Sequence, residues 1–265
     1  MQRIAFKLVT LFFLLGLGAC ARPEAAASRV DYGRWSEGEL AQLVAAVRPL
    51  PPGARIVTLS GAFLGTPYAG GTLVGGPDRA EELVIDLAGV DCFTFLDQVE
   101  ALRRAASLND FPQELRQVRY RGGVVSYENR RHFFSDWVAD DAARIVDVTA
   151  AVGQGRAEAV VKELNRREDG SLWLPGLAVT ERKVSYIPGS RIDREVLAAL
   201  QDGDYVGIYA PHAGEDVSHT GLVLRTGEKV LLRHASSSRD LRRVVDVDLL
   251  QYLLGKPGLV IYRAR

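Results

Sequence analysis

The chain has 265 residues, with 33 basic and 33 acidic side chains, and 47% of its residues are hydrophobic. This balance is typical of a folded globular protein, and it argues against a largely disordered chain and against a multi-pass membrane protein. A formal net charge of zero without a long basic run also argues against nucleic acid as the main partner, because phosphate binding needs clustered lysine and arginine.

The first residues have the pattern of an export signal. Arg3 and Lys7 precede an apolar run over residues 8–17, which has the length of a signal-peptide core and is too short to span a bilayer. The run ends in Leu17-Gly18-Ala19-Cys20, and small residues before a cysteine resemble a bacterial lipoprotein signal. Cleavage as an ordinary secretory peptide, near Ala19 or Ala21, is the alternative.

The lipoprotein interpretation divides the chain into three parts. We expect a signal peptide over residues 1–19, a tether over residues 20–35 and a single domain over residues 36–265. Cys20 would carry the lipid, so the membrane contact would be through this lipid only. Ala21 after the lipidated cysteine is typical of outer-membrane sorting, and we expect a bacterial cell-envelope location on the periplasmic face of that membrane.

Two helices are predicted before residue 110. Ser36-Glu37-Gly38-Glu39 predicts a helix that runs to Val47 and is ended by the prolines at 49–52, whereas the glycine-rich residues 56–76 predict mostly loop. Asp91 is a good N-cap for the second helix, in which apolar residues follow at spacings of three and four. Cys92 lies in its first turn. The polar side chains expected off the apolar stripe are Asp97, Glu100 and Arg103 or Arg104.

The rest of the chain divides into a mixed middle and a strand-rich end. Residues 110–200 predict mixed connecting structure, with a short helix over Asp140–Ile145 and a helix over Glu158–Arg167. Strands are predicted over Asp204–Tyr209, Val217–Thr226, Lys229–Ser236 and Gly258–Tyr262, with a helix around Val247–Leu254. A helix that carries a residue of interest and packs on an antiparallel sheet indicates the α+β class.

The hairpin around Gly227-Glu228 brings two histidines to one face. A two-residue turn pairs Thr226 with Lys229, so that His234 faces Gly221 and His219 faces Ser236. Because strand side chains alternate, these four residues share a side, and the two histidines become diagonal neighbours about 7–8 Å apart. A single bulge would break this parity.

Three interpretations of the histidines compete. Zinc binding lacks a third ligand at metal-like spacing and an HExxH motif, so we expect no metal. Two structural histidines, with Cys92 as a buried inert thiol, form the second interpretation. A cysteine–histidine enzyme fits better, because a helix N-terminus favours thiolate and a nearby histidine can hold the thiol proton. This interpretation predicts a lowered thiol pKa and fast alkylation of Cys92 at pH 7.

The order of these motifs resembles the NlpC/P60 papain-like cell-wall hydrolases. The matching pieces are Leu64-Gly65-Thr66-Pro67-Tyr68, Asp91-Cys92, Ser218-His219-Thr220-Gly221 and His234-Ala235-Ser236. The stretches Arg131–Trp137 and Asp216–His219 are similar to one branch, catalogued as DUF1460 and described as N-acetylmuramoyl-L-alanine amidase-like. The resemblance covers most of residues 60–263.

The resemblance implies a fold and a set of site residues. The fold would be papain-like, with the nucleophile helix packed on an antiparallel sheet and a mixed insertion between nucleophile and histidines. Cys92 would be the nucleophile, His219 the base and His234 the orienting third member, with no cofactor. The implied substrate-binding residues are Tyr68, Asp91, Arg131, His132, Asp136, Trp137, Asp216, Ser218 and Ser236. The chain departs from the branch at Glu215, where an apolar residue is usual, and at Phe133, where tyrosine is usual.

Some of these residues also have a purely structural interpretation. Tyr68 and Trp137 could pack on the core, Asp136 could cap a helix, and His132 could be a surface histidine. His212 is expected to lie in a plain loop.

The implied reaction is hydrolysis of the amide that joins the lactyl group of N-acetylmuramic acid to L-alanine, through a thioester on Cys92. Peptidoglycan or a muropeptide fragment would be the partner. A non-catalytic wall-binding lipoprotein, a stem-peptide endopeptidase and an acyltransferase that uses the same thioester are the alternatives.

Overall fold

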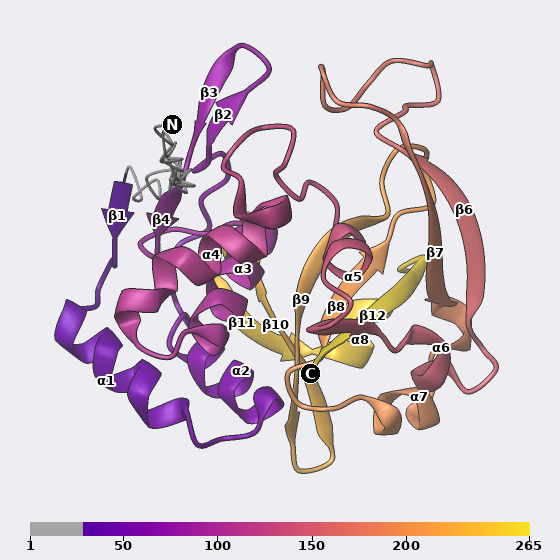
Figure 1. Ribbon diagram of the computed structural model, residues 1–265. Helices are drawn as coiled ribbons and strands as arrows, with labels where there is room; N and C mark the ends of the chain where they lie inside the picture. Colours follow the sequence, from indigo (N-terminus) through magenta and orange to yellow (C-terminus); the bar gives the residue numbers. More distant parts are fainter. Residues whose placement is uncertain (1–28) are drawn as a thin grey trace, which may run out of the picture.

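The computed structural model describes residues 29–265, and Figure 1 shows the four longest helices on one side of the molecule and a large sheet with shorter helices on the other. The expected signal peptide, the lipidation site Cys20 and the first part of the expected tether lie outside the described residues. The described chain is an α+β protein with a mainly antiparallel sheet, as predicted. No helix in this part of the chain is both long and apolar enough to cross a membrane.

Four helices form the helical side: α1 (Glu37–Val47), α2 (Pro52–Gly61), α3 (Cys92–Arg104) and α4 (Phe111–Arg119). The predicted start of α1 is confirmed, because Ser36 and Glu39 form a reciprocal capping box. The first six residues of the loop expected over residues 56–76 instead belong to α2. Pro52 ends nothing here; it occupies the first position of α2, where its missing N–H costs no hydrogen bond.

The second half of the expected tether belongs to the folded body. Strand β1 (Arg29–Asp31) pairs in parallel with β4 (Val84–Asp86), and Tyr32 and Trp35 pack against the main core. Strands β2 (Val74–Gly76) and β3 (Arg79–Glu82) form a separate small hairpin. Residues 29–35 are therefore held by backbone pairing and apolar contact.

An eight-stranded sheet forms the other side, in the order β11-β10-β9-β8-β12-β7-β6, with β5 also paired to β12. Its strands are β5 (Ile145–Asp147), β6 (Glu158–Leu164), β7 (Thr180–Pro188), β8 (Tyr205–Tyr209), β9 (Val217–Thr226), β10 (Lys229–Ala235), β11 (Val244–Asp248) and β12 (Gly258–Ala264). Short helices connect them: α5 (Asp136–Asp140), α6 (Thr149–Gly153), α7 (Arg194–Ala199) and α8 (Leu249–Leu253). The 3-10 turns are η1 (Leu108–Asp110), η2 (Arg121–Gly123) and η3 (Gly189–Arg191).

Three predicted helices differ from the structure. The helix predicted over Glu158–Arg167 is strand β6, which pairs with β7 along its whole length. The helix predicted over Asp140–Ile145 is a turn between α5 and β5, and the helix predicted from Val247 begins later because β11 takes residues up to Asp248. For β6 and β11, hydrogen bonding to the neighbouring strand overrides the local helical pattern, whereas residues 141–144 only connect α5 to β5.

The elements that position the chemistry agree with the predictions. Helix α3 starts at Cys92 with Asp91 as its N-cap, and β9 and β10 pair in the expected register from Thr226↔Lys229 to Leu222↔Arg233. The polar positions of α3 are the exception, because Asp97 and Glu100 are buried. Each carboxylate there pairs with arginine, Asp97 with Arg119 at 2.9 Å and Glu100 with Arg103 at 2.6 Å.

Candidate active site

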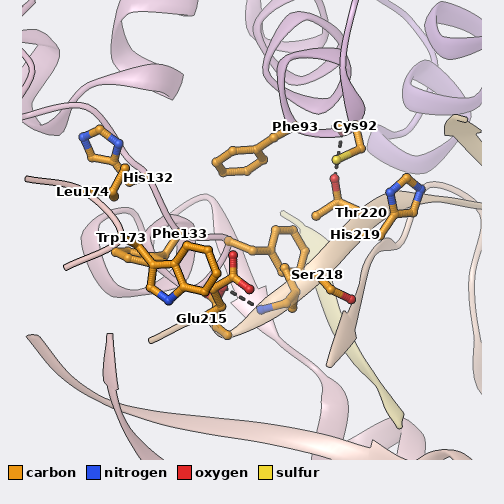
Figure 2. Close-up of a pocket in the computed structure, with 13 residues that line it drawn as sticks. Cys92, Phe93, His132, Phe133, Trp173, Leu174, Glu215, Ser218, His219 and Thr220 are labelled. Atoms are coloured by element: carbon orange, nitrogen blue, oxygen red, sulfur yellow. Dashed lines mark hydrogen bonds between the residues drawn. The ribbon is translucent and has the colours of Figure 1, made fainter. Parts of the chain in front are cut away.

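A cavity of about 250 Å³ lies where the N-terminus of α3 meets the first half of β9. Figure 2 shows Cys92, Thr220 and His219 at one end of this cavity and Trp173, Leu174 and His132 at the other. Cysteine and histidine, predicted to act together, therefore open into the same space. The described residues contain no cluster of histidine, cysteine, aspartate and glutamate that could hold a metal ion.

Helix α3 presents Cys92 through its first turn. Asp91 Oδ1 accepts hydrogen bonds from the N–H groups of Phe93 and Thr94, at 3.0 and 2.7 Å. On the facing strand, Thr220 Oγ1 donates to the Cys92 carbonyl oxygen at 2.8 Å and ties β9 to the start of the helix. Asp91 satisfies the N–H groups of Phe93 and Thr94 and leaves that of Cys92, which lies beside the thiol at the start of the helix.

The two histidines form a hydrogen-bonded pair. His219 Nε2 and His234 Nδ1 are 2.7 Å apart, and the two rings meet at 88° with their centroids 4.9 Å apart. Gly221 makes this possible, because a side chain there would come within 2.6 Å of Leu232 Cδ1 and 3.2 Å of His234 Cβ. The pair engages Nε2 of His219, so Nδ1 is the nitrogen left for the thiol.

The thiol pKa moves in the opposite direction to the prediction. Burial of the Cys92 thiol raises its pKa, and the nearby Asp91 carboxylate adds to this, while hydrogen bonds from Thr220 oppose it. The helix N-terminus is thus outweighed by desolvation and by its own capping carboxylate. The expected lowered thiol pKa is wrong for the free protein.

The histidines resist protonation for the same reason. Burial, with smaller contributions from His234 and Lys256, lowers the pKa of His219 to about 3. Burial lowers the pKa of His234 to about 4 against the opposing attraction of Asp246. The free site at pH 7 therefore holds a neutral thiol beside a neutral imidazole, an arrangement in which histidine takes the proton as the thiol attacks.

Five of the predicted site residues line the cavity: Cys92, His132, Asp216, Ser218 and His219. His132 Nε2 is 2.8 Å from the Tyr127 carbonyl oxygen, and burial lowers the pKa of this imidazole to about 4. Because a carbonyl oxygen only accepts, Nε2 carries the proton and Nδ1 is an acceptor. Asp216 is buried and accepts from the N–H groups of Ser135 and Val217, at 2.6 and 2.7 Å.

The other predicted residues lie outside the cavity wall: Tyr68, Asp91, Arg131, Asp136, Trp137, His234 and Ser236. Trp137 is only 2% exposed and packs in the core, with its ring centroid 5.1 Å from that of Tyr205. Arg131 donates to the carbonyl oxygens of Gln117 and Val118. These contacts match the structural interpretation of Trp137 and give Arg131 a structural role as well.

Asp136 and Ser236 both bind backbone N–H groups. Asp136 is buried, accepts from the N–H groups of His132 and Phe133 and pairs with Arg182 at 3.1 Å. Ser236, also buried, accepts a hydrogen bond from the N–H of Ser238 at 3.3 Å.

Tyr68 is half-buried near the thiol. The Arg242 guanidinium lies 4.8 Å from the centroid of its ring. Burial raises the pKa of Tyr68, and the nearby Cys92 and Asp91 raise it further, so the phenol stays protonated at neutral pH. Tyr68 therefore offers a neutral hydroxyl group close to the N-terminus of α3.

Several wall residues were not predicted, and most come from segments far from α3. Trp173 and Leu174 belong to the connection between β6 and β7, and Phe93 follows the cysteine. Asn165 fixes the connection, because its buried side chain accepts from the Leu174 N–H at 2.7 Å and donates to two carbonyl oxygens. Trp173 Nε1 also donates to the Ala213 carbonyl oxygen at 3.2 Å. No local sequence signal marks these long-range contacts.

Comparison with protein families identifies a family for this chain. The family model described as "AmiA-like: N-acetylmuramoyl-L-alanine amidase-like" matches residues 58–259. This range contains the cavity and both elements that form the cysteine–histidine arrangement. Comparison with curated proteins finds no significant match.

Solved structures share the fold. A Legionella pneumophila protein assigned to the DUF1460 family model has a TM-score of 0.74 and 24% identity, covering 86% of this chain and 94% of its own. An N-acetylmuramoyl-L-alanine amidase from Bacteroides uniformis has a TM-score of 0.68 and 26% identity, covering 81% of this chain and 99% of its own. A Bacteroides fragilis protein described as a putative xylanase has a TM-score of 0.64 and 26% identity, covering 78% of this chain and 99% of its own.

Proposed function

The chain belongs to the AmiA-like family of N-acetylmuramoyl-L-alanine amidase-like proteins, and from this premise we propose that it is a cysteine amidase. Its substrate would be peptidoglycan or a muropeptide fragment, and it would cut the amide between the lactyl group of N-acetylmuramic acid and L-alanine. The observation that carries the proposal is that Cys92 and His219 open into one cavity, while His234 holds the far nitrogen of His219 at 2.7 Å.

The proposed reaction begins with proton transfer. His219 Nδ1 takes the thiol proton as Cys92 Sγ attacks the amide carbonyl carbon, and His234 orients the imidazole. The Cys92 N–H at the end of α3 and the neutral Tyr68 hydroxyl are the donors that we assign to the oxyanion. His219 then gives its proton to the departing alanine amine, and water releases the acyl group from the thioester.

The wider features of the protein belong to the same proposal. The order of motifs supports a papain-like NlpC/P60 fold, with residues 36–265 forming one catalytic domain. The apolar run before Cys20 supports a lipoprotein signal over residues 1–19, hence lipid anchoring in the cell envelope on the periplasmic face of the outer membrane. Residues 29–35 pack on this domain, so only residues 21–28 would separate the folded body from a lipid on Cys20.

Digestion of purified muropeptides with the wild-type protein, followed by mass measurement of the products, tests the proposed activity. We expect a free sugar and a peptide that begins with L-alanine, whose masses sum to that of the substrate plus one water. The Cys92→Ala variant should lose at least about 10³-fold in rate.

Other products would identify other activities. A cut within the peptide would indicate an endopeptidase, and a cut between sugars a glycosidase. Transfer of the muramoyl group to an added amine would indicate an acyltransferase. Binding without any mass change would indicate a non-catalytic wall-binding protein and would overturn the proposal.

A further inference from the structure

One nitrogen of the histidine pair has no hydrogen-bond partner among the described residues. His234 is 3% exposed, its Nδ1 faces His219, and its Nε2 is buried without a partner. Buried ring nitrogens are normally satisfied, so this nitrogen needs an explanation. The question matters because the tautomer of His234 decides which nitrogen of His219 can act as a base.

The tautomers of the two rings are linked. If His219 Nε2 donates to His234 Nδ1, then His219 Nδ1 is unprotonated and can accept the thiol proton, and His234 must carry its own proton on Nε2. If His234 Nδ1 donates instead, His219 carries its proton on Nδ1, facing the thiol, and cannot act as a base. A neutral pair allows both forms, so something must select the first.

The aromatic ring of Tyr252 is the group in position to do so. Tyr252 lies on α8, and its ring centroid is 5.1 Å from that of His234 with the two planes at 61°, an edge-to-face arrangement. The same ring lies 6.1 Å from His219. An aromatic face accepts a weak hydrogen bond from an N–H group but offers nothing to a bare nitrogen lone pair.

We propose that Tyr252 is a positioning residue that selects the Nε2–H tautomer of His234 and thereby makes His219 Nδ1 the base. The inference rests on the proposed cysteine mechanism for its catalytic consequence, but the tautomer itself is a property of the free protein. The ring, rather than the hydroxyl group, performs this role.

Other charged groups act on the pair without determining the tautomer. Asp246 on β11 attracts the charged form of His234, and Lys256 after α8 repels that of His219 and lies 5.2 Å from the Tyr252 ring centroid. Burial raises the pKa of the Tyr252 hydroxyl, and the nearby Cys92 on α3 raises it further, so this hydroxyl is neutral at pH 7. These charges affect protonation to the cation, whereas the π face of Tyr252 favours one of two neutral forms.

Nitrogen-15 NMR of the histidine rings tests the inference directly. The Cys92→Ala variant at neutral pH should show His234 protonated at Nε2 and His219 also protonated at Nε2, with the signals assigned through His234→Gln. Tyr252→Phe should keep this pattern because it keeps the ring, whereas Tyr252→Leu should shift His234 toward Nδ1–H. Leu254→Ala, an exposed change beside α8, is the control and should leave the spectrum unchanged.

Activity provides a second readout. We expect kcat to fall about tenfold in Tyr252→Leu and to stay within about twofold in Tyr252→Phe, with KM little changed. A wild-type His234 protonated at Nδ1, or a Tyr252→Leu variant with unchanged tautomers, would overturn the inference. If Tyr252→Leu does not fold, Tyr252→Met takes its place, because it also removes the aromatic face, and unchanged tautomers in that variant would overturn the inference. If the tautomers are as expected but the protein cuts no muropeptide, the proposed function is wrong and the inference about Tyr252 still holds for the free protein.

Discussion

The β9–β10 and β6–β7 hairpins lie in the same sheet but occupy opposite situations in it. Strands β9 and β10 are flanked by β8 and β11, and a two-residue turn joins them. Strand β6 is at the edge of the sheet and pairs only with β7, and a connection over residues 165–179 joins the two. The interior hairpin carries the two histidines, while the connection of the edge hairpin supplies Trp173 and Leu174 to the cavity.

This division separates two tasks. Proton transfer needs the imidazoles placed to within a few tenths of an ångström. Interior strands provide that precision because both neighbours hold them, with His219 opposite Ile208 of β8 and His234 opposite Val245 of β11. Recognition of a substrate needs a wall that differs between relatives, and a connection at a sheet edge accepts changes more readily. Substitutions in the interior hairpin should therefore mainly lower kcat, whereas substitutions in the connection of the edge hairpin should mainly raise KM and have smaller effects.

The largest effect is expected from His219→Ala in the interior hairpin. Removal of the base should lower kcat by at least about 10³-fold while the fold remains intact. Muropeptide turnover and circular dichroism measure the two quantities. Lys229→Ala, at the exposed start of β10, is the matched control and should keep full activity. Comparable activity in the two variants would remove His219 from the mechanism.

Gly221→Val should be the next most damaging change. The added side chain would meet Leu232 Cδ1 and, at 2.9 Å, the Arg233 carbonyl oxygen, which is backbone and cannot give way cheaply. We expect the free energy of unfolding to fall by about 1–3 kcal/mol, measured by urea denaturation. Gly38→Ala in α1 has open space around it and should be neutral or stabilising.

Alkylation of Cys92 should be slow at pH 7 and should accelerate as the pH rises. The thiol pKa is raised by burial, and each pKa unit by which it is raised lowers the thiolate population about tenfold. Iodoacetamide labelling of Cys92, compared with N-acetylcysteine from pH 6 to pH 10, measures this. Labelling faster than the small thiol at pH 7 would mean that the neutral pair described above is not the resting state.

The smallest effect is expected in the edge hairpin. Trp173 is 39% exposed, so Trp173→Ala should change the free energy of unfolding by less than about 0.5 kcal/mol. Because Trp173 lines the cavity wall, its replacement by alanine should raise KM severalfold and leave kcat within about twofold of the wild-type value. Val161→Thr on β6, at a position 59% exposed, is the control and should change neither. If Trp173→Ala lowered kcat as much as His219→Ala does, the two hairpins would not divide their tasks.

The sequence predicts the interior hairpin and α3 because their signals are local. Asp91 marks the start of α3, and the Gly227-Glu228 turn fixes the register that brings His219 beside His234. Strand β6 is different, because its inner face carries the buried Lys162, whose ammonium group bonds to the His212 carbonyl oxygen at 2.7 Å. A lysine at an inward position hides the alternation expected of a strand, and the segment then resembles a helix.

Two features of the site depend on contacts that no local pattern reveals. Trp173 reaches the cavity because Asn165 holds Leu174 and Leu177, and the Ala213 carbonyl holds the indole. The thiol pKa depends on how deeply α3 is covered, which outweighs the helix N-terminus that the sequence does show. The sequence thus predicts which side chains form the cysteine–histidine arrangement, but it does not predict how deeply they are buried or which residues form the cavity wall.

The pairing of β1 with β4 has a mechanical consequence. Three parallel register pairs, the bond from the Leu87 N–H to the Asp31 carbonyl oxygen at 2.7 Å and an Arg29–Asp86 ion pair at 3.3 Å join the two strands. Tension applied to the chain ahead of Arg29 would load this pair in shear, along the strand axis. A short strand pair of this kind would separate before the core unfolds. The force would then be released before it distorts the core, although the loop from β4 to Asp91 would lose its support.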